Sequence, residues 1–346
     1  MRIIHGGDIY SKDIKYDFSA NINPLGMPER VKKVICENIR LFERYPDCKC
    51  TSLKRAIADK ENVSEKNIVC GNGASDLIYR IVRTICPKKA LLIAPTFSEY
   101  EKALIQNNCN IEYYYLSEKY NFIIKEDILD KLVEKDIIFI CQPNNPIGNV
   151  TDGKLLKKIA YKCREKNIIL VVDESFLDFV PEYWQYELKA FGDYVIILKA
   201  FTKIYAMAGL RLGYLICMNK NLCEIIEDCG QCWSVSVPAQ IAGEVALKES
   251  AYIEKTVNYV SSERNYLTEN LKDLGFKIYP SESNFLMIKT NIPLDDMLLK
   301  EKIAIRNCDN YVGLGKGYFR IAVRTHEENE ILIKALERII KTWQKQ

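Results

Sequence analysis

The segment AFTKIYAMAGLRLGYL, residues 200–215, contains a lysine whose neighbours suit covalent chemistry. Lys203 follows an apolar, strand-like run and is flanked by Phe201 and Ile204. An unpaired lysine in apolar surroundings has a lowered pKa, which favours the neutral, nucleophilic amine. Arg211 follows in a glycine-containing turn and supplies a fixed positive charge nearby. Lys203 could instead be an ordinary surface lysine whose aliphatic chain covers apolar atoms while its amine stays in water. That interpretation accounts for Lys203 itself but not for this combination of neighbours.

Three other segments place polar groups directly after apolar runs. The motif DESFLDF begins with Asp173 after the run NIILVV, and CQPNNPIGN, residues 141–149, follows DIIFIC. The motif CGNGASDLIYRIV, residues 70–82, has a Gly-Asn-Gly turn before a helical pattern. Backbone amides at such a helix start bind phosphate well. Each motif alone also fits an ordinary turn, but together they predict one site with a phosphate cradle, a buried acid and a lysine.

These segments belong to a regular alternation of short apolar runs with amphipathic, helix-length segments. Such alternation predicts an α/β fold with a mostly parallel sheet and helices on both of its faces. The expected strands are residues 68–70, 90–94, 111–116, 136–141, 168–172, 195–198 and 213–217, and the expected helices between them are residues 74–85, 99–106, 154–166 and 222–229.

The pattern changes near residue 238, where long helices (239–248 and 252–274) lead into short strands and a closing helix over 327–341. This change predicts a second, smaller α+β domain. We expect an N-terminal arm and helix over 1–44, with the helix at 29–42, packing with that small domain. A large domain over 45–238 and a small domain over 239–346 complete the predicted division.

Composition limits the classes of partner. The 346 residues carry a net charge of only +3, so nothing indicates nucleic acid or a membrane as the partner. Thirteen scattered cysteines indicate free thiols in a reducing cytoplasm. The two histidines, His5 and His326, lie near opposite ends of the chain, so we expect no metal site.

The motifs together resemble the fold-type I pyridoxal-phosphate (PLP) enzymes, and among them the histidinol-phosphate aminotransferase branch. The resemblance runs nearly end to end, through HGGDI, DFSANINPLGMP, ERYPD, GNGASDLI, PNNPIG, DESFLDF, TKIYAMAGLRLGYL, WSVSVPAQIAGEVAL, IRNCDNY and YFRIAVR. The HGG opening and NINPLGMP are more particular to branch members that decarboxylate L-threonine O-3-phosphate to aminopropanol phosphate in cobalamin biosynthesis. That reaction is the function that the resemblance implies.

The resemblance also implies roles for individual residues. Lys203 would carry PLP and move protons, and Asp173 would pair with the protonated ring nitrogen. Asn145 would hydrogen-bond the ring hydroxyl oxygen, and Phe97 would stack on the ring. The cofactor phosphate would be bound by Gly73, Ala74, Ser75, Thr202 and Arg211, and by Tyr45 from the second subunit of a homodimer.

Substrate binding would involve two arginines, which suit a substrate with two anionic groups. The implied substrate residues are His5, Gly6, Asn21, Asn145, Arg306 and Arg320. The chain departs from the branch at three positions. Ala200 replaces a serine that usually binds the cofactor phosphate, Phe176 replaces a tyrosine of the aminotransferases, and Ala208 replaces a common proline.

Three alternatives stay open at this point. One is an aminotransferase acting on histidinol phosphate or a related amino acid. Another is a serine-phosphate decarboxylase, since a pocket discriminates one methyl group by only about 1–3 kcal/mol. The third is a non-catalytic PLP-binding sensor module, which the chain disfavours because it opens directly on the HGG motif without a basic DNA-binding module.

Overall fold

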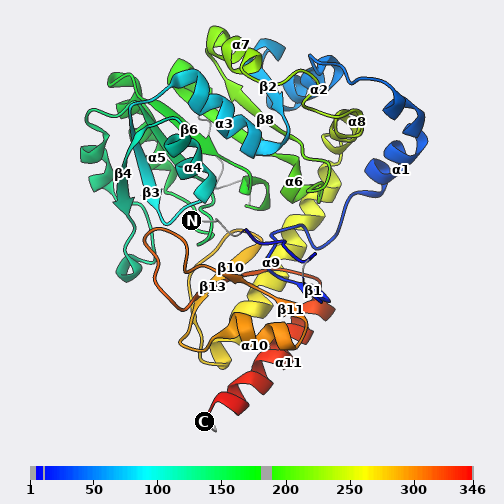
Figure 1. Ribbon diagram of the computed structural model, residues 1–346, viewed down its shortest axis with the longest axis vertical. Coiled ribbons are helices and arrows are strands. Elements are labelled where there is room, and N and C mark those ends of the chain that lie inside the picture. The colour runs from blue at the N-terminus through cyan, green and yellow to red at the C-terminus, as the bar shows by residue number, and fades with distance from the viewer. Residues whose placement is uncertain (1–4, 11, 181–188, 345–346) are drawn as a thin grey trace.

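The computed structural model describes residues 5–10, 12–180 and 189–344. Its largest sheet contains seven strands: β2 (Ile68–Gly71), β3 (Lys89–Ala94), β4 (Asn110–Tyr115), β5 (Ile137–Cys141), β6 (Ile169–Asp173), β7 (Val195–Ala200) and β8 (Gly213–Cys217). Their order is β2-β8-β7-β6-β5-β3-β4. Strand β8 is antiparallel to β2 and β7, whereas all the other pairs are parallel. The predicted mostly parallel sheet is therefore confirmed (Figure 1).

Both faces of this sheet are covered by helices, because alternate side chains of the apolar strands enter two different cores. In β5, Phe139 packs into one core, whereas Ile138 and Ile140 pack into the other. The first core includes α3 (Gly73–Ile85), α4 (Ser98–Gln106) and α7 (Lys220–Asp228). The second includes α2 (Thr51–Glu61), α5 (Gly153–Glu165) and α8 (Val237–Ala246).

The strand register brings three functional segments to one edge of the sheet. Cys141, which ends β5, pairs with Asp173, which ends β6, and Asp173 pairs with Leu198 of β7. The short helix α6 (Phe201–Ile204) follows β7 immediately. The turn after β5, the acid of β6 and Lys203 of α6 therefore lie next to one another at the C-terminal ends of parallel strands, where α/β sheets bind ligands.

The predicted smaller α+β domain is also confirmed. It contains α9 (Ser250–Asp273), β9 (Lys277–Ile278), β10 (Phe285–Lys289), α10 (Leu294–Lys300), β11 (Ile303–Ala304), β12 (Arg306–Asn307), β13 (Tyr318–Ala322) and α11 (His326–Trp343). Four of its strands form an antiparallel sheet in the order β12-β13-β10-β9. A capping box between Thr325 and Glu328 starts α11. Figure 1 shows the long helix α9 running from near α6 toward this small sheet.

The N-terminal region differs from the prediction in one element. The helix expected over residues 29–42 is wrong in its second half, because α1 (Glu29–Glu37) ends at Asn38 and a 3₁₀ helix, η1 (Ile39–Glu43), follows. The side chain of Asn38 donates a hydrogen bond to the carbonyl oxygen of Val34, and its backbone N–H bonds Ile35 instead of continuing the α-helical pattern. Further 3₁₀ helices cover Glu65–Asn67, Glu118–Tyr120, Glu126–Leu132, Leu177–Phe179 and Lys189–Tyr194.

The N-terminal region contacts both parts of the molecule. Strand β1 (Tyr16–Asp17) pairs in parallel with β11, and α1 packs on α8. Helix α8 in turn lies against α2, and a Cβ added to Gly243 would stand 2.6 Å from the side chain of Leu212. The domain division at residue 238 stays a prediction. This packing favours a boundary closer to the start of α9.

No helix in residues 5–10, 12–180 and 189–344 has the length and apolarity that crossing a membrane requires. Within the same residues, no group of three or more His, Cys, Asp or Glu side chains is arranged to hold a metal ion.

Candidate active site

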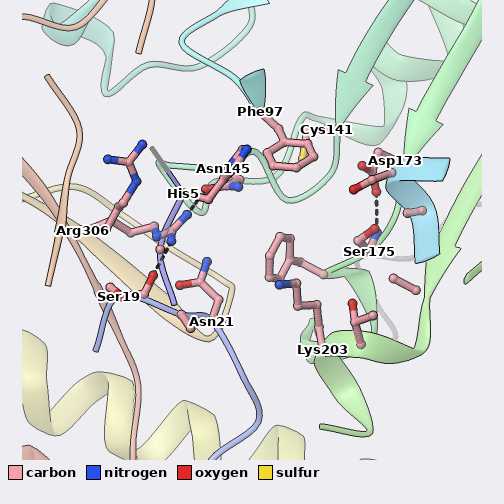
Figure 2. Close-up of a pocket in the computed structure, with 18 of the residues that line it drawn as sticks. His5, Ser19, Asn21, Phe97, Cys141, Asn145, Asp173, Ser175, Lys203 and Arg306 are labelled. Atoms are coloured by element: carbon pink, nitrogen blue, oxygen red, sulfur yellow. Dashed lines mark hydrogen bonds between the residues drawn. The ribbon is translucent and has the colours of Figure 1, made fainter. Parts of the chain in front are cut away.

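A cavity of about 160 Å³ lies at the C-terminal ends of β5, β6 and β7 and is lined from the other side by Arg306 and Arg320 of the small domain. Segments from the N-terminal arm, both domains and the turns after the strands contribute to it (Figure 2). Thirteen of the fifteen predicted site residues line this cavity: His5, Gly6, Asn21, Ala74, Ser75, Phe97, Asn145, Asp173, Thr202, Lys203, Arg211, Arg306 and Arg320.

Lys203 has the electrostatic environment that its sequence neighbours predict. Burial of the amine, together with the nearby guanidinium groups of Arg320 and Arg211, lowers the pKa of Lys203 to about 8. Its Nζ lies 5.6 Å from the centre of the Phe176 ring, which is an apolar neighbour. A substantial fraction of the amine is therefore neutral near pH 8 and able to act as a nucleophile.

Asp173 is a buried carboxylate at the end of β6. One of its oxygens accepts the backbone N–H of Ser175 at 2.9 Å, and the other accepts the hydroxyl of Tyr100 at 2.6 Å. Among the described residues no Lys, Arg or His forms an ion pair with it within 4.0 Å. A buried carboxylate normally needs a cation, so this environment suits a protonated ring nitrogen as the missing partner.

Arg320 and Asn21 leave buried polar atoms for a ligand. Arg320, on β13, donates to the side-chain oxygen of Asn145 and, at 2.7 Å, to the carbonyl oxygen of Ser19. Within the described part of the chain, Nε of Arg320 and Oδ1 of Asn21 are buried without any hydrogen-bond partner. Buried polar atoms are rarely left unsatisfied, so both atoms fit a bound polar molecule.

The start of α3 forms a cradle beside Arg211. Gly73 has a φ of +80°, and a Cβ added to it would stand 2.7 Å from the Arg211 guanidinium. A Cβ on Gly213 would stand 2.6 Å from the amide nitrogen of Ala74. The side chain of Asn72, the N-cap residue of α3, makes no capping hydrogen bond with a described residue, so the amides of Gly73 and Ala74 and the Arg211 guanidinium can bind a phosphate group together. Ser75, which carries a hydroxyl group, also lines the cavity. Ala200 lines it too, at the position where the resemblance implies a serine.

A second arginine lies beside Arg320. Arg306 of β12 pairs directly with Arg320 in the β12–β13 register, and both residues are 6% exposed. The Arg306 guanidinium donates to Asn310 at 2.7 Å and lies 5.2 Å from the centre of the Tyr311 ring. Two fixed positive charges therefore occupy one wall of the cavity.

Two predicted residues lie outside the cavity lining. Gly73 is next to it, since it packs against Arg211. Tyr45 is 79% exposed, and its ring lies 4.7 Å from the ring of Trp233. Within a single chain, Tyr45 is therefore on the surface rather than among the residues that line the site.

Three further residues belong to the site but were missed from the sequence. Tyr100 binds Asp173, packs edge-on against Phe97 at 5.6 Å and stacks on Phe139. Tyr311 lines the cavity, and Glu99 holds His5 from outside it. Glu99 and Tyr100 lie within three residues of Phe97, and Tyr311 ends the motif IRNCDNY, so the available signal was their closeness to residues already predicted to belong to the site.

Comparison with known proteins defines the class. The model of the aminotransferase class I and II family matches residues 13–336, so the chain belongs to this family and is a PLP-dependent enzyme. It is similar to the threonine-phosphate decarboxylase of Salmonella typhimurium, with 36% identity covering 97% of this chain and 96% of that protein.

Two other similarities bear on the function. An adenosylcobalamin biosynthesis bifunctional protein of Leptospira interrogans is 36% identical over 97% of this chain and 41% of that protein. The crystal structure of the histidinol-phosphate aminotransferase from Clostridium acetobutylicum has a TM-score of 0.89 and 31% identity, covering 95% of this chain and all of that chain. The predicted fold-type I architecture is thus confirmed.

Proposed function

We propose that this protein decarboxylates L-threonine O-3-phosphate to aminopropanol phosphate for cobalamin biosynthesis. The observation that carries the proposal is the pair of buried arginines, Arg306 and Arg320, on one wall of a cavity that also contains Lys203. Clustered guanidinium groups suit a substrate that carries a phosphate in addition to its carboxylate. The names of the Salmonella and Leptospira relatives support the same reaction and the same pathway.

PLP, when bound, supplies an electron sink that accepts the electron pair of a bond broken at Cα. Lys203 would hold the cofactor covalently and, once the substrate amine has replaced it, return a proton to Cα. Asp173, supported by Tyr100, would keep a proton on the ring nitrogen. Phe97 would pack on the ring and Asn145 would bind its hydroxyl oxygen. Thr202, Ser75, Arg211 and the amides of Gly73 and Ala74 would bind the cofactor phosphate.

Which bond at Cα breaks would depend on how the residues of this chain orient the substrate against the bound cofactor. In our proposal the substrate phosphate binds at the Arg320 end of the site with Arg306, His5, Gly6 and Asn21. A phosphate carries more charge than a carboxylate and gains more from clustered donors. The carboxylate would then be left without the arginines as partners and be lost as carbon dioxide, at the expense of some carboxylate contacts.

The direct test is incubation of the holoenzyme with threonine phosphate, threonine and histidinol phosphate while carbon dioxide and keto products are measured together. We expect carbon dioxide from threonine phosphate, and slower turnover with relatively more keto acid from threonine. In His5→Ala the two product ratios should approach each other. Transamination of histidinol phosphate without carbon dioxide release from threonine phosphate would establish the aminotransferase alternative, which the Clostridium structure favours. If the enzyme decarboxylates serine phosphate faster than threonine phosphate, serine phosphate is its substrate instead.

We also propose that the enzyme is a cytoplasmic homodimer in which Tyr45 of one subunit reaches the cofactor phosphate of the other. The exposure of Tyr45 and its ring contact with the half-exposed Trp233 support a role at a subunit interface. All thirteen cysteines are free, which supports a reducing compartment.

A further inference from the structure

Glu99 lies in the first turn of α4, two residues after Phe97, and connects three separate parts of the chain. One of its oxygens is 2.9 Å from Nε2 of His5 in the N-terminal arm. Its other oxygen accepts the hydroxyl of Tyr79, on α3, at 2.8 Å. The residue is only 8% exposed, although it does not line the cavity. Glu99 therefore fixes the arm to the two helices that carry Phe97 and the phosphate cradle.

The charge state of Glu99 determines which nitrogen of His5 carries a proton. The hydrogen bond from His5, with further contributions from Tyr79 and Lys102, lowers the pKa of Glu99 to about 2. An ionised carboxylate can only accept hydrogen bonds, so Nε2 of His5 must donate. Nδ1 is then the remaining polar atom of the ring, and it has no hydrogen-bond partner among the described residues. A protonated His5 would present Nδ1–H as a donor to an anion.

Gly6 and Gly7 of the N-terminal arm also have closely defined positions. The N–H of Gly7 donates to the hydroxyl of Ser19 at 2.8 Å. A Cβ on Gly6 would stand 2.0 Å from the carbonyl oxygen of Ser19 and 3.3 Å from a guanidinium nitrogen of Arg320. The arm thus contacts the arginine wall at Gly6 and α4 at His5. The His5 ring lies 5.9 Å from the ring of Phe97 and lines the same cavity as both arginines.

We propose that Glu99 is a positioning residue for recognition of the substrate phosphate: it orients His5 so that Nδ1, together with Arg306 and Arg320, receives that phosphate. The identity of the anion rests on the proposed function. Glu99 itself does not touch the substrate. When His5 donates to the bound anion from Nδ1, the Glu99 carboxylate supplies the negative charge that offsets the two neighbouring guanidinium groups.

The chain offers a matched control for this role. Glu101 lies on the same helix and also accepts a tyrosine hydroxyl, from Tyr113, but no hydrogen bond or ion pair connects it with any described residue of the arm. Glu99→Gln keeps an acceptor for Tyr79 and removes the charge that pairs with His5. Glu101→Gln makes the same chemical change at a neighbouring position. A His5→Ala, Glu99→Gln double variant shows whether Glu99 acts through His5.

Two measurements on the holoenzyme test the proposal. For Glu99→Gln we expect KM for threonine phosphate to rise roughly tenfold or more with kcat changed less than about threefold, because a charge-assisted contact of the bound substrate is lost. Glu101→Gln should keep the wild-type KM. Adding Glu99→Gln to His5→Ala should raise KM no further. Hydrogen exchange at the amide of Gly7 should become roughly tenfold faster in Glu99→Gln alone, because the arm opens more often.

A failure of the proposed role of Glu99 can be distinguished from a failure of the proposed function. If the wild type releases no carbon dioxide from threonine phosphate, the proposed function is wrong, but the exchange rates still decide whether Glu99 holds the arm. Equal KM values and equal exchange in the two single variants would overturn the role of Glu99. Additive KM effects in the double variant would overturn it as well, since Glu99 would then act independently of His5.

Discussion

At the scale of single residues, Lys203 and Asp173 show two different consequences of burial. Asp173 accepts hydrogen bonds from the backbone N–H of Ser175 and from the hydroxyl of Tyr100. Within the described residues Lys203 forms no ion pair within 4.0 Å, and the same cavity places Arg320 and Arg211 close enough to disfavour its charged form. One site therefore contains a buried acid suited to a ring nitrogen and an amine suited to nucleophilic attack.

The lowered pKa of Lys203 makes a prediction for the apoenzyme. Only the neutral amine attacks PLP, so the rate of cofactor attachment should rise with pH and level off above about 8, instead of rising to the ordinary lysine value near 10.4. Stopped-flow absorbance of PLP mixed with apoenzyme measures this rate. Arg320→Met removes a positive charge that disfavours the ammonium form, so its midpoint should move to higher pH. A wild-type midpoint near 10 would contradict the assignment of Lys203.

At the scale of elements, the parallel strands and the start of α3 determine where the polar groups stand. Buried strands β5, β6 and β7 end in register, so the segments that follow them meet at one edge. The left-handed backbone of Gly73 lets α3 begin directly against the Arg211 guanidinium. A residue with a side chain would be strained at this φ and would also push Arg211 away.

A substitution at Gly73 tests this close approach. Gly73→Ala should weaken PLP binding by roughly tenfold or more, because the new Cβ at 2.7 Å displaces Arg211, and the backbone strain should cost about 1–3 kcal/mol of stability. Gly275→Ala is the matched control: Gly275 has a φ of +82° but nothing within 4 Å of an added Cβ. It should show the loss of stability with unchanged PLP affinity. Equal PLP affinity in the two variants would argue against the cradle. Fluorescence titration and thermal denaturation provide the measurements.

At the scale of the whole molecule, the site depends on how the two domains are held together. Glu118, which follows β4, accepts the hydroxyls of Tyr279 and Tyr318 at 2.6 and 2.8 Å. It also pairs with Lys277 and Lys289, and these contacts lower its pKa well below the usual value. Tyr318 begins β13, the strand that carries Arg320. This cluster thus fixes the strand of the arginine wall to the large domain.

The proposed homodimer gives a prediction at the same scale. Lys203→Ala and Tyr45→Phe should each be inactive or nearly so, and mixing them after subunit exchange should restore about a quarter of the wild-type sites. Half of the dimers are then mixed, and each mixed dimer has one site with both Lys203 and the partner subunit's Tyr45. The rate of carbon dioxide release before and after exchange measures the recovery. Full activity of Tyr45→Phe alone, or no recovery on mixing, would contradict the role of Tyr45 across the interface.

The sequence alone determined the large sheet, the small α+β domain and most of the cavity lining. All seven strands of the large sheet were predicted to within about two residues, because buried strands are local apolar runs bounded by turn residues. Thirteen of the fifteen predicted site residues line one cavity, and most of them lie in motifs at the end of a strand or in a turn. The helix at 29–42 failed where a local side-chain hydrogen bond of Asn38 competes with the helical pattern.

Only the tertiary structure decided which distant residues meet. The contacts of Tyr100 with Asp173, of His5 with Glu99 and of Arg320 with Ser19 join positions far apart in the chain. No periodicity in the sequence encodes such pairs, since they depend on strand order, register and the packing of one domain on the other. Local patterns follow from the preferences of neighbouring residues. The hydrogen bonds that orient the site follow from the whole fold, which alone brings their donors and acceptors within reach.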